Sequence, residues 1–236
     1  MFDIALIGSF GAADAADHYL FHIAGIGVSP YITSMWIVMA FLILISFLAT
    51  RNLQWRPTGL QNVVEMAFEA LLDFLGGIMG KKAARKYFPF LATIFIFILF
   101  MNYSSVLPGS GTLPWLTTPT TTWSVTLALA LCVFFSIHYY GIKEKGLGYF
   151  KHFIEPYPFF LPLNLLEEIT KPLSLSLRLF GNMFGEKMVG MTLFGLVPLL
   201  LPLPAYFLGL LFGSIQAFVF TLLAAVYIST ATSGGH

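Results

Sequence analysis

The sequence predicts an all-α integral membrane protein with about five membrane helices and one amphipathic helix on the membrane surface. Of its 236 residues, 58% are hydrophobic and 10% are charged, whereas a soluble domain has about 25% charged residues. The mean hydropathy is +0.84. The apolar residues form continuous runs of about 20, the length of a helix that crosses a bilayer. A transmembrane barrel would show short alternating segments instead.

These runs divide the chain into a tail and a single membrane domain. We expect an N-terminal outer-side tail at 1–30 and a membrane domain at 31–236, with spans at 31–51, 88–107, 123–141, 163–197 and 199–230. Residues 52–87 differ, because apolar residues recur there near helical spacing while Glu65, Glu69 and Asp73 form an i, i+4 series on another face. This pattern predicts an amphipathic helix on the inner membrane surface. The alternative is a soluble connecting helix.

Basic residues predict the orientation of the spans. The tail and the loop at 108–122 contain no Lys or Arg. Nine basic residues lie instead in two connections on the opposite side: Arg51, Arg56, Lys81, Lys82, Arg85, Lys86, Lys143, Lys145 and Lys151. By the positive-inside rule the N-terminus faces outward and the C-terminus faces the cytoplasm. An odd number of spans agrees with this orientation.

Several classes of function are not indicated. No basic cluster with interleaved aromatic residues predicts nucleic-acid binding. The sequence has no Gly-rich motif that cradles phosphate and no nucleophile–base pair, so stand-alone enzyme activity is not expected. We expect no cofactor and no metal, and the single cysteine, Cys132, excludes an intrachain disulfide.

The segment 163–197 is unusually long and carries a polar stripe. As a helix it would extend about 50 Å, against about 30 Å of hydrocarbon, so it must tilt, kink at Pro172 or begin outside the core. At about 100° per residue, a set of polar residues and one glycine falls within roughly 40° of one line: Glu167, Lys171, Ser174, Arg178, Asn182 and Gly185. Such a stripe must face protein or water. Glu167 and Lys171 are interpreted as an interfacial ion pair.

Arg178 lies deep in this run, with no acidic residue within one turn. Arginine keeps its proton, and a charge at that depth costs about 2.5–3.5 kcal/mol. The spans at 31–50, 88–107, 123–140 and 199–230 contain no acid, and Glu186, with Lys187 beside it, is the only deep one. We therefore predict that the carboxylate that compensates Arg178 belongs to another chain.

The last span contains Gln216 among apolar residues, with Ser214, Thr221 and Tyr227 nearby. Two interpretations stay open for the polar residues Ser214, Gln216 and Thr221. They form ordinary interhelical hydrogen bonds, or they have a role in an ion path. His138, at the inner end of the third span, is interpreted as an interfacial histidine.

The stretches "KPLSLSLRLFGNMFGE" and "IQAFVFTLLAAVYIS" closely resemble the a subunit (subunit 6) of the F-type ATP synthase membrane sector, and "RPTGLQNVVE" at 56–65 is also typical of it. The resemblance implies a stator subunit that forms two ion half-channels against a ring of c subunits and couples proton translocation to ring rotation. ATP chemistry would occur on other subunits. The implied partners are the c-ring, the peripheral-stalk b subunits and the lipid bilayer, within a large hetero-oligomer. The implied location is an energy-coupling membrane, the bacterial inner membrane.

The resemblance also implies roles for individual residues. Arg178 matches the essential arginine, Asn182 the asparagine four residues on, and Gln216 the glutamine of the last helix. Many members have Glu nine positions after the arginine, but here Glu186 is eight positions after it and Lys187 is the ninth. Some bacterial members have a histidine seven residues before the glutamine, where this chain has Gly209.

We expect Glu186 to serve the outer half-channel. We place Glu167, Glu168 and Ser174 on the proton path as well, with the two acids near its inner exit. The alternative function is a secondary transporter with a buried cationic site for an anionic substrate. Such a transporter would show an internal repeat and a pair of broken helices.

Overall fold

The structure is a computed structural model that describes residues 21–23, 26–51, 59–105, 117–146, 148–149, 161–196 and 202–232. A short antiparallel hairpin comes first, β1 (Phe21–Ile23) with β2 (Ile26–Val28). The helices follow in the order α2 (Pro30–Thr50), α3 (Leu60–Met79), α4 (Lys81–Tyr103), the 3-10 turn η1 (Pro119–Thr121), α5 (Trp123–Lys145), α6 (Leu161–Leu196) and α7 (Pro202–Thr232). The predicted all-α membrane fold is confirmed, and the small hairpin is the one addition among the described residues.

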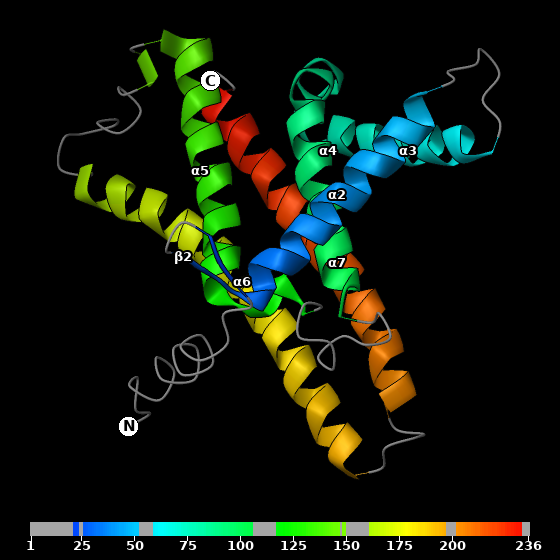
Figure 1. Cartoon of the computed structure of the whole chain (residues 1–236). Helices are drawn as coiled ribbons and strands as arrows, with labels where there is room; N and C mark the ends of the chain where they lie inside the picture. The colour runs from blue at the N-terminus through cyan, green and yellow to red at the C-terminus, as the bar shows by residue number, and fades with distance from the viewer. Residues whose placement is uncertain are drawn as a thin grey trace.

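Four of the described helices, α2, α4, α5 and the greater part of α7, are long and apolar enough to cross a membrane by length and composition. α6 is outside this group because charged residues interrupt its apolar sequence. It nevertheless runs unbroken for 36 residues, through Pro172. At 1.5 Å per residue it is about 54 Å long. Figure 1 shows that it crosses the other helices obliquely, as expected for a helix longer than the hydrocarbon layer.

The amphipathic helix α3 ends at Met79, and Gly80 separates it from α4. Gly80 has φ +81°, in the left-handed region that favours glycine, and its N–H donates to the carbonyl of Gly76 at 3.1 Å. The expected boundary at residue 87 therefore lies inside α4, and Lys81 and Lys82 begin that helix. α3 lies at a steep angle to α4 in Figure 1, as a surface helix would.

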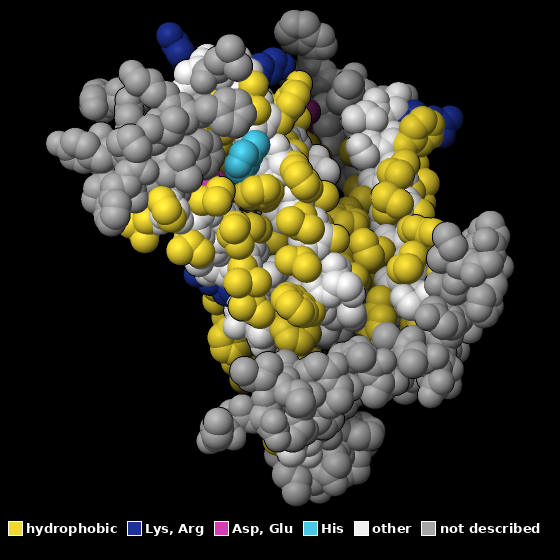
Figure 2. All heavy atoms as spheres, turned by 90° about the vertical axis from the view of Figure 1, so that its left-hand side faces the viewer, with side chains coloured by type: hydrophobic (Ala, Val, Ile, Leu, Met, Phe, Trp, Pro, Cys, Tyr) yellow, Lys and Arg dark blue, Asp and Glu magenta, His cyan; other side chains and the backbone are white. Residues whose placement is uncertain are grey.

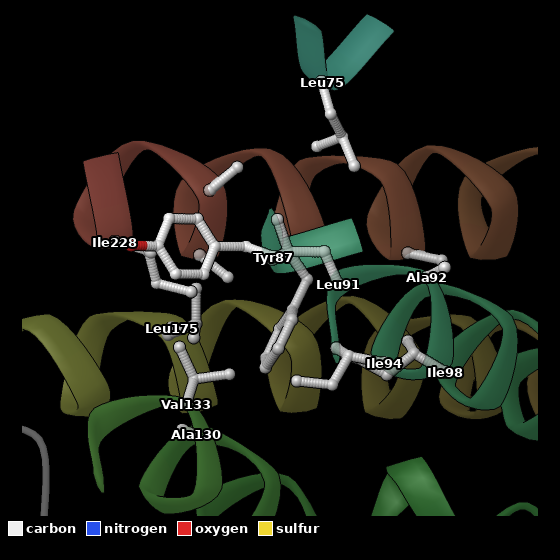
Figure 3. Packing of buried hydrophobic residues seen from close by; sticks show 14 of the residues in the cluster. Leu75, Tyr87, Leu91, Ala92, Ile94, Ile98, Ala130, Val133, Leu175 and Ile228 are labelled. Carbon is white, nitrogen blue, oxygen red and sulfur yellow. The ribbon is translucent and has the colours of Figure 1, made fainter. Parts of the chain in front are cut away.

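The hydrophobic core lies among α3, α4, α5, α6 and α7 (Figure 3). Leu91 and Ile98 of α4, Val133 of α5, Leu179 of α6 and Phe220 of α7 are all at most 1% exposed. Small residues allow close approach, and α7 contributes Ala217, Ala224 and Ala225 with no exposed surface. This packing fixes the register of α6 against α7, on which the site depends.

Large apolar side chains cover much of the outer surface, and Figure 2 shows them over most of the described part of one face. On α2, Ile43 is 64% and Phe47 60% exposed. A water-soluble protein would bury such side chains, whereas a bilayer solvates them. The structure therefore agrees with a multi-pass membrane protein.

The first turns of α4 and the last turn of α5 lie at the same end of the molecule. Lys86 of α4 forms an ion pair with Glu144 of α5, and the hydroxyl of Tyr87 donates to Glu144 at 3.1 Å. The ring of Tyr87 also packs on Tyr140, with 4.8 Å between centroids. The basic residues at 81–86 and at 143–145 are thus gathered at one end.

Candidate functional site

The centre of the site is a pair of amides that joins α6 to α7. Asn182 Nδ2 donates a hydrogen bond to Gln216 Oε1 at 2.5 Å. Gln216 is 2% exposed, and its Nε2 has no hydrogen-bond partner among the described residues. An unsatisfied buried amide group costs about 1–3 kcal/mol. A buried polar group without a partner calls for an explanation, such as contact with water or with a side chain of a partner.

Arg178 lies one turn before Asn182 on α6 and is exposed. Within the described part of the chain, no acid lies within ion-pair distance of its guanidinium. Behind it on the same helix, Leu175, Leu179 and Met183 are buried at 3% or less. The core thus holds the backbone of α6 firmly while the Arg178 side chain points outward from the molecule.

A first polar cluster lies on the C-terminal side of Arg178 and consists of Glu186, Ser105 and Gly209; we call it the Glu186 cluster. Ser105 Oγ donates to Glu186 Oε1 at 3.1 Å, and Glu186 Oε2 is buried with no hydrogen-bond partner in the described segments. A Cβ atom at Gly209 would overlap the Glu186 carboxylate. The carboxyl group therefore occupies the space that a side chain on α7 would need.

Two hydrogen bonds next to the Glu186 cluster hold α4 to α7. Asn102 Nδ2 donates to the carbonyl of Gly213 at 3.0 Å, and a hydrogen bond of 2.7 Å joins Tyr103 Oη and Ser214 Oγ. Asn102 is 2% exposed, and its Oδ1 has no hydrogen-bond partner among the residues that the structure describes. These groups add polar atoms between α4 and α7 on the side of Arg178 where Glu186 lies.

A second polar cluster lies on the N-terminal side of Arg178 and consists of Glu168, Lys171 and His138; we call it the Glu168 cluster. Lys171 Nζ lies 2.5 Å from Glu168 Oε1 and 3.7 Å from Glu167 Oε1. Glu168 Oε2 lies 4.0 Å from His138 Nε2. The Glu167 side chain is 70% exposed and that of Glu168 is 11% exposed, so Glu168 is the main partner of Lys171.

Two aromatic rings from outside α6 border this cluster. Tyr149 is 3% exposed and its ring centroid lies 5.8 Å from that of His138. It packs on Gly141, where a Cβ atom would overlap its ring. Burial, with a contribution from the Glu168 carboxylate, raises the pKa of Tyr149 to about 12. From α7, the ring of Tyr227 lies 5.8 Å from Lys171 Nζ, within cation–π distance.

The site residues predicted from the sequence lie at the amide pair next to Arg178, in the Glu186 cluster and in the Glu168 cluster. Arg178, Asn182 and Gln216 lie together, Glu186 lies in the first cluster, Glu168 in the second, and Ser174 is half-buried between Lys171 and Arg178 on α6. Ser214 forms an interhelical hydrogen bond, whereas Thr221 bonds to Ala217 on its own helix.

Sequence reasoning missed Asn102, Tyr103, Ser105 and Tyr149. Only Asn102 carried a signal, as an amide in an apolar run.

The described residues contain no group of three or more His, Cys, Asp or Glu side chains that could hold a metal ion. Two acids on α6 contact a base or a hydroxyl group instead, Glu168 with Lys171 and Glu186 with Ser105.

Comparison with known proteins gives one consistent result. The sequence profile of the ATP synthase A chain family matches residues 32–229. The chain is 46% identical over 216 residues to ATP synthase subunit a of Moorella thermoacetica, covering 91% of this chain and 96% of the relative. It is 40% identical over 230 residues to the chloroplastic ATP synthase subunit a of Stigeoclonium helveticum, covering 93% and 92%. It is 42% identical over 214 residues to ATP synthase subunit a 1 of Syntrophotalea carbinolica, covering 89% and 88%.

Proposed function

The chain belongs to the ATP synthase A chain family, and we propose that it is the stationary subunit along which protons cross the membrane and drive rotation. The alternative of a secondary transporter is not supported by the comparisons. ATP chemistry belongs to other subunits in this proposal. The chain itself would contribute two proton paths and the charge that separates them.

One observation carries the proposal. Arg178 is exposed and has no described acidic partner within ion-pair distance, while a carboxylate of low exposure lies on each side of it along α6. Glu168 lies ten positions before it and Glu186 eight positions after it. At 1.5 Å per residue these spacings are about 15 and 12 Å. An unpaired cation between two proton-exchanging groups suits a barrier between two separate paths.

The missing partner of Arg178 would be a carboxylate on the c-ring. A ring carboxylate that faces lipid stays neutral because desolvation disfavours its charged form. Beside Arg178 the fixed positive charge favours ionisation, so the proton is released there. Arginine retains its own proton and blocks a direct leak between the two paths. At about 2.3 kcal/mol per charge per 100 mV, the membrane potential then drives rotation.

We assign Glu186, with Ser105 and Asn102 beside it, to the outer half-channel. Glu168 and Ser174 are assigned to the inner half-channel, and exposed Glu167 to its mouth. Asn182 and Gln216 would position water or the ring carboxylate near Arg178. Gln216 Nε2 and Glu186 Oε2 have no hydrogen-bond partner among the described residues. This supports the assignment, because a water would accept a hydrogen bond from the amide and a transferred proton would bind the carboxylate oxygen.

We further propose that the chain sits in the bacterial inner membrane with its N-terminus outside and its C-terminus in the cytoplasm. The basic residues gathered at the α4 and α5 ends support this orientation. The c-ring would cover the face of α6 and α7 that carries Arg178. The peripheral-stalk b subunits would contact other helices of the chain.

The test is Arg178→Ala in the whole complex. We expect the complex to assemble while ATP synthesis and ATP-driven proton pumping in inverted vesicles fall below detection. The matched control is Arg85→Ala, an exposed arginine in the first turns of α4, which should pump normally. Normal pumping by Arg178→Ala would falsify the proposal.

A further inference from the structure

We propose that a recess at the end of the molecule where α4 begins and α5 and α7 end binds the phosphate group of an anionic phospholipid. The recess has a volume of about 260 Å³, whereas a single buried water needs about 10–15 Å³. The inference goes beyond the proposed function and uses only its orientation, with this end toward the cytoplasm. The residues around the recess that bear on ligand binding are Lys82, Lys86 and Tyr87 of α4, Glu144 of α5, and Ser229 and Thr232 of α7.

The recess lies at the depth of the lipid headgroups. The helices α4, α5 and the greater part of α7 are long and apolar enough to cross a membrane, and the ends that form the recess lie together at the top of Figure 1. Tyrosines, which are typical of a membrane interface, lie beside it. The ring of Tyr140 packs on Tyr87 with 4.8 Å between centroids and on Tyr139 with 5.4 Å. A lipid headgroup can therefore reach the recess from within the bilayer.

Two lysines of α4 line the recess together. Lys82 and Lys86 are four positions apart, and like charges at this spacing on a helix repel each other. Lys82 also lies in the first turn of α4, where the helix dipole disfavours cations. Around them, residues 81–86 and 143–145 hold six basic residues and one acid. An anionic group in the recess would offset both unfavourable effects, and basic pockets between membrane helices on the cytoplasmic side are typical sites for anionic headgroups.

The acid in the lining of the recess is already engaged. Glu144 forms an ion pair with Lys86 and accepts a hydrogen bond of 3.1 Å from Tyr87 Oη. Lys82 is exposed, and in the described part of the chain no acid lies within ion-pair distance of its Nζ. Lys82 therefore supplies the positive charge that a bound phosphate group requires.

The surroundings of the recess favour a lipid over a soluble anion. Its wall includes the apolar side chains of Met79 and Ala83. On α7, Val226 lies three positions before Ser229, on the same face of the helix, and is 37% exposed. Because α7 ends at the recess, Val226 lies deeper in the membrane than Ser229, where an acyl chain would continue. A phospholipid would gain from these apolar contacts, whereas free phosphate would not.

The experiment places the whole complex in vesicles that contain a photoactivatable phospholipid with the reactive group near the glycerol. Phosphatidylglycerol is compared with phosphatidylcholine of identical acyl chains. After illumination and digestion with a protease that does not cut at Lys or Arg, mass spectrometry measures the label on peptides that contain residues 79–87 and 226–232. ATP-driven pumping, which should be normal in every variant, shows that the complex is assembled.

The variants separate the recess from the general charge of this end of the molecule. Lys82→Gln removes the charge that we assign to binding, and Lys82→Arg keeps it. Lys81→Gln is the matched control, because it removes a charge from the neighbouring position, which does not line the recess. We expect phosphatidylglycerol to label the peptides more strongly than phosphatidylcholine. Lys82→Gln should lower this preference about fivefold, the effect of one lysine near a membrane surface, while the other two variants should retain it.

Four outcomes would overturn the inference. They are equal labelling by the two lipids, an unchanged preference in Lys82→Gln, an equal loss in Lys81→Gln, and no label on these peptides because a protein segment covers the recess. Millimolar inorganic phosphate should leave the labelling unchanged, and displacement by it would identify a soluble anion as the ligand instead of a lipid. Normal pumping by Arg178→Ala would refute the proposed proton path but would not alter any of these results.

Discussion

Asn182 and Gln216 are joined by a hydrogen bond of 2.5 Å, which ties α6 to α7 one turn beyond Arg178. Arg178 and Asn182 are both exposed, so the bond joins the two helices at an exposed part of the polar face of α6. It also orients Gln216 so that its Nε2, with no partner among the described residues, is free to bind a group from outside the chain.

The first prediction is that this pair acts as a unit. Asn182→Ala and Gln216→Ala should each slow ATP-driven pumping, and the double variant should be little slower than the worse single one. Rates from inverted vesicles, converted to free energies, should give a coupling of about 0.5–1.5 kcal/mol. Strict additivity would mean that the two amides act independently.

The second prediction concerns the close approach of Glu186 to α7. Gly209→Ala places a methyl group where the Glu186 carboxylate lies, so the carboxylate must move. We expect pumping to fall several-fold, and the second change Glu186→Asp, which shortens the side chain by one methylene, to restore part of the rate. Gly190→Ala on α6, where a Cβ meets nothing within 4 Å, is the control. No effect of Gly209→Ala would show that the position of this carboxylate is unimportant.

The third prediction separates the charge of Glu186 from its orientation. Glu186→Gln should slow proton transport less severely than Arg178→Ala does. Ser105→Ala removes a bond of 3.1 Å and should slow pumping about fivefold, the effect of about 1 kcal/mol. Ser105→Thr keeps the hydroxyl and should remain close to the unmodified complex. Equal rates for Ser105→Ala and Ser105→Thr would contradict a role for the hydroxyl.

The helical period of one segment predicted which residues share a face, and it correctly grouped Arg178 with Asn182. It could not predict contacts between helices, because periodicity within a helix says nothing about its register against another. The contacts of Glu186 with Ser105, of Asn182 with Gln216 and of His138 with Glu168 all depend on such registers. They join residues 81, 34 and 30 positions apart.

Local chemistry explains the helix boundaries that were predicted less well. The described part of the predicted amphipathic segment 52–87 forms the whole of α3 and the start of α4, since Gly80 adopts φ +81° and interrupts the helix. A glycine inside an apolar, helix-forming stretch is compatible with either outcome. The packing of Leu75 and Ala84, both fully buried, then holds the two helices at their angle.

The last prediction tests the packing that supports the Glu168 cluster. Tyr149 lies against Gly141, and an added Cβ at that position would overlap the ring. An alanine in a helix is otherwise favoured over glycine by about 0.5–1 kcal/mol, so a loss of stability from Gly141→Ala would come from the overlap. We expect overpacking to cost about 1–3 kcal/mol, measured as a lower midpoint in thermal unfolding of the purified complex. Gly77→Ala, on α3 with open space around its Cβ, should leave the midpoint unchanged or raise it. If both variants had the same midpoint, Tyr149 would be able to move away at no cost, and its contact with Gly141 would not position the ring beside His138.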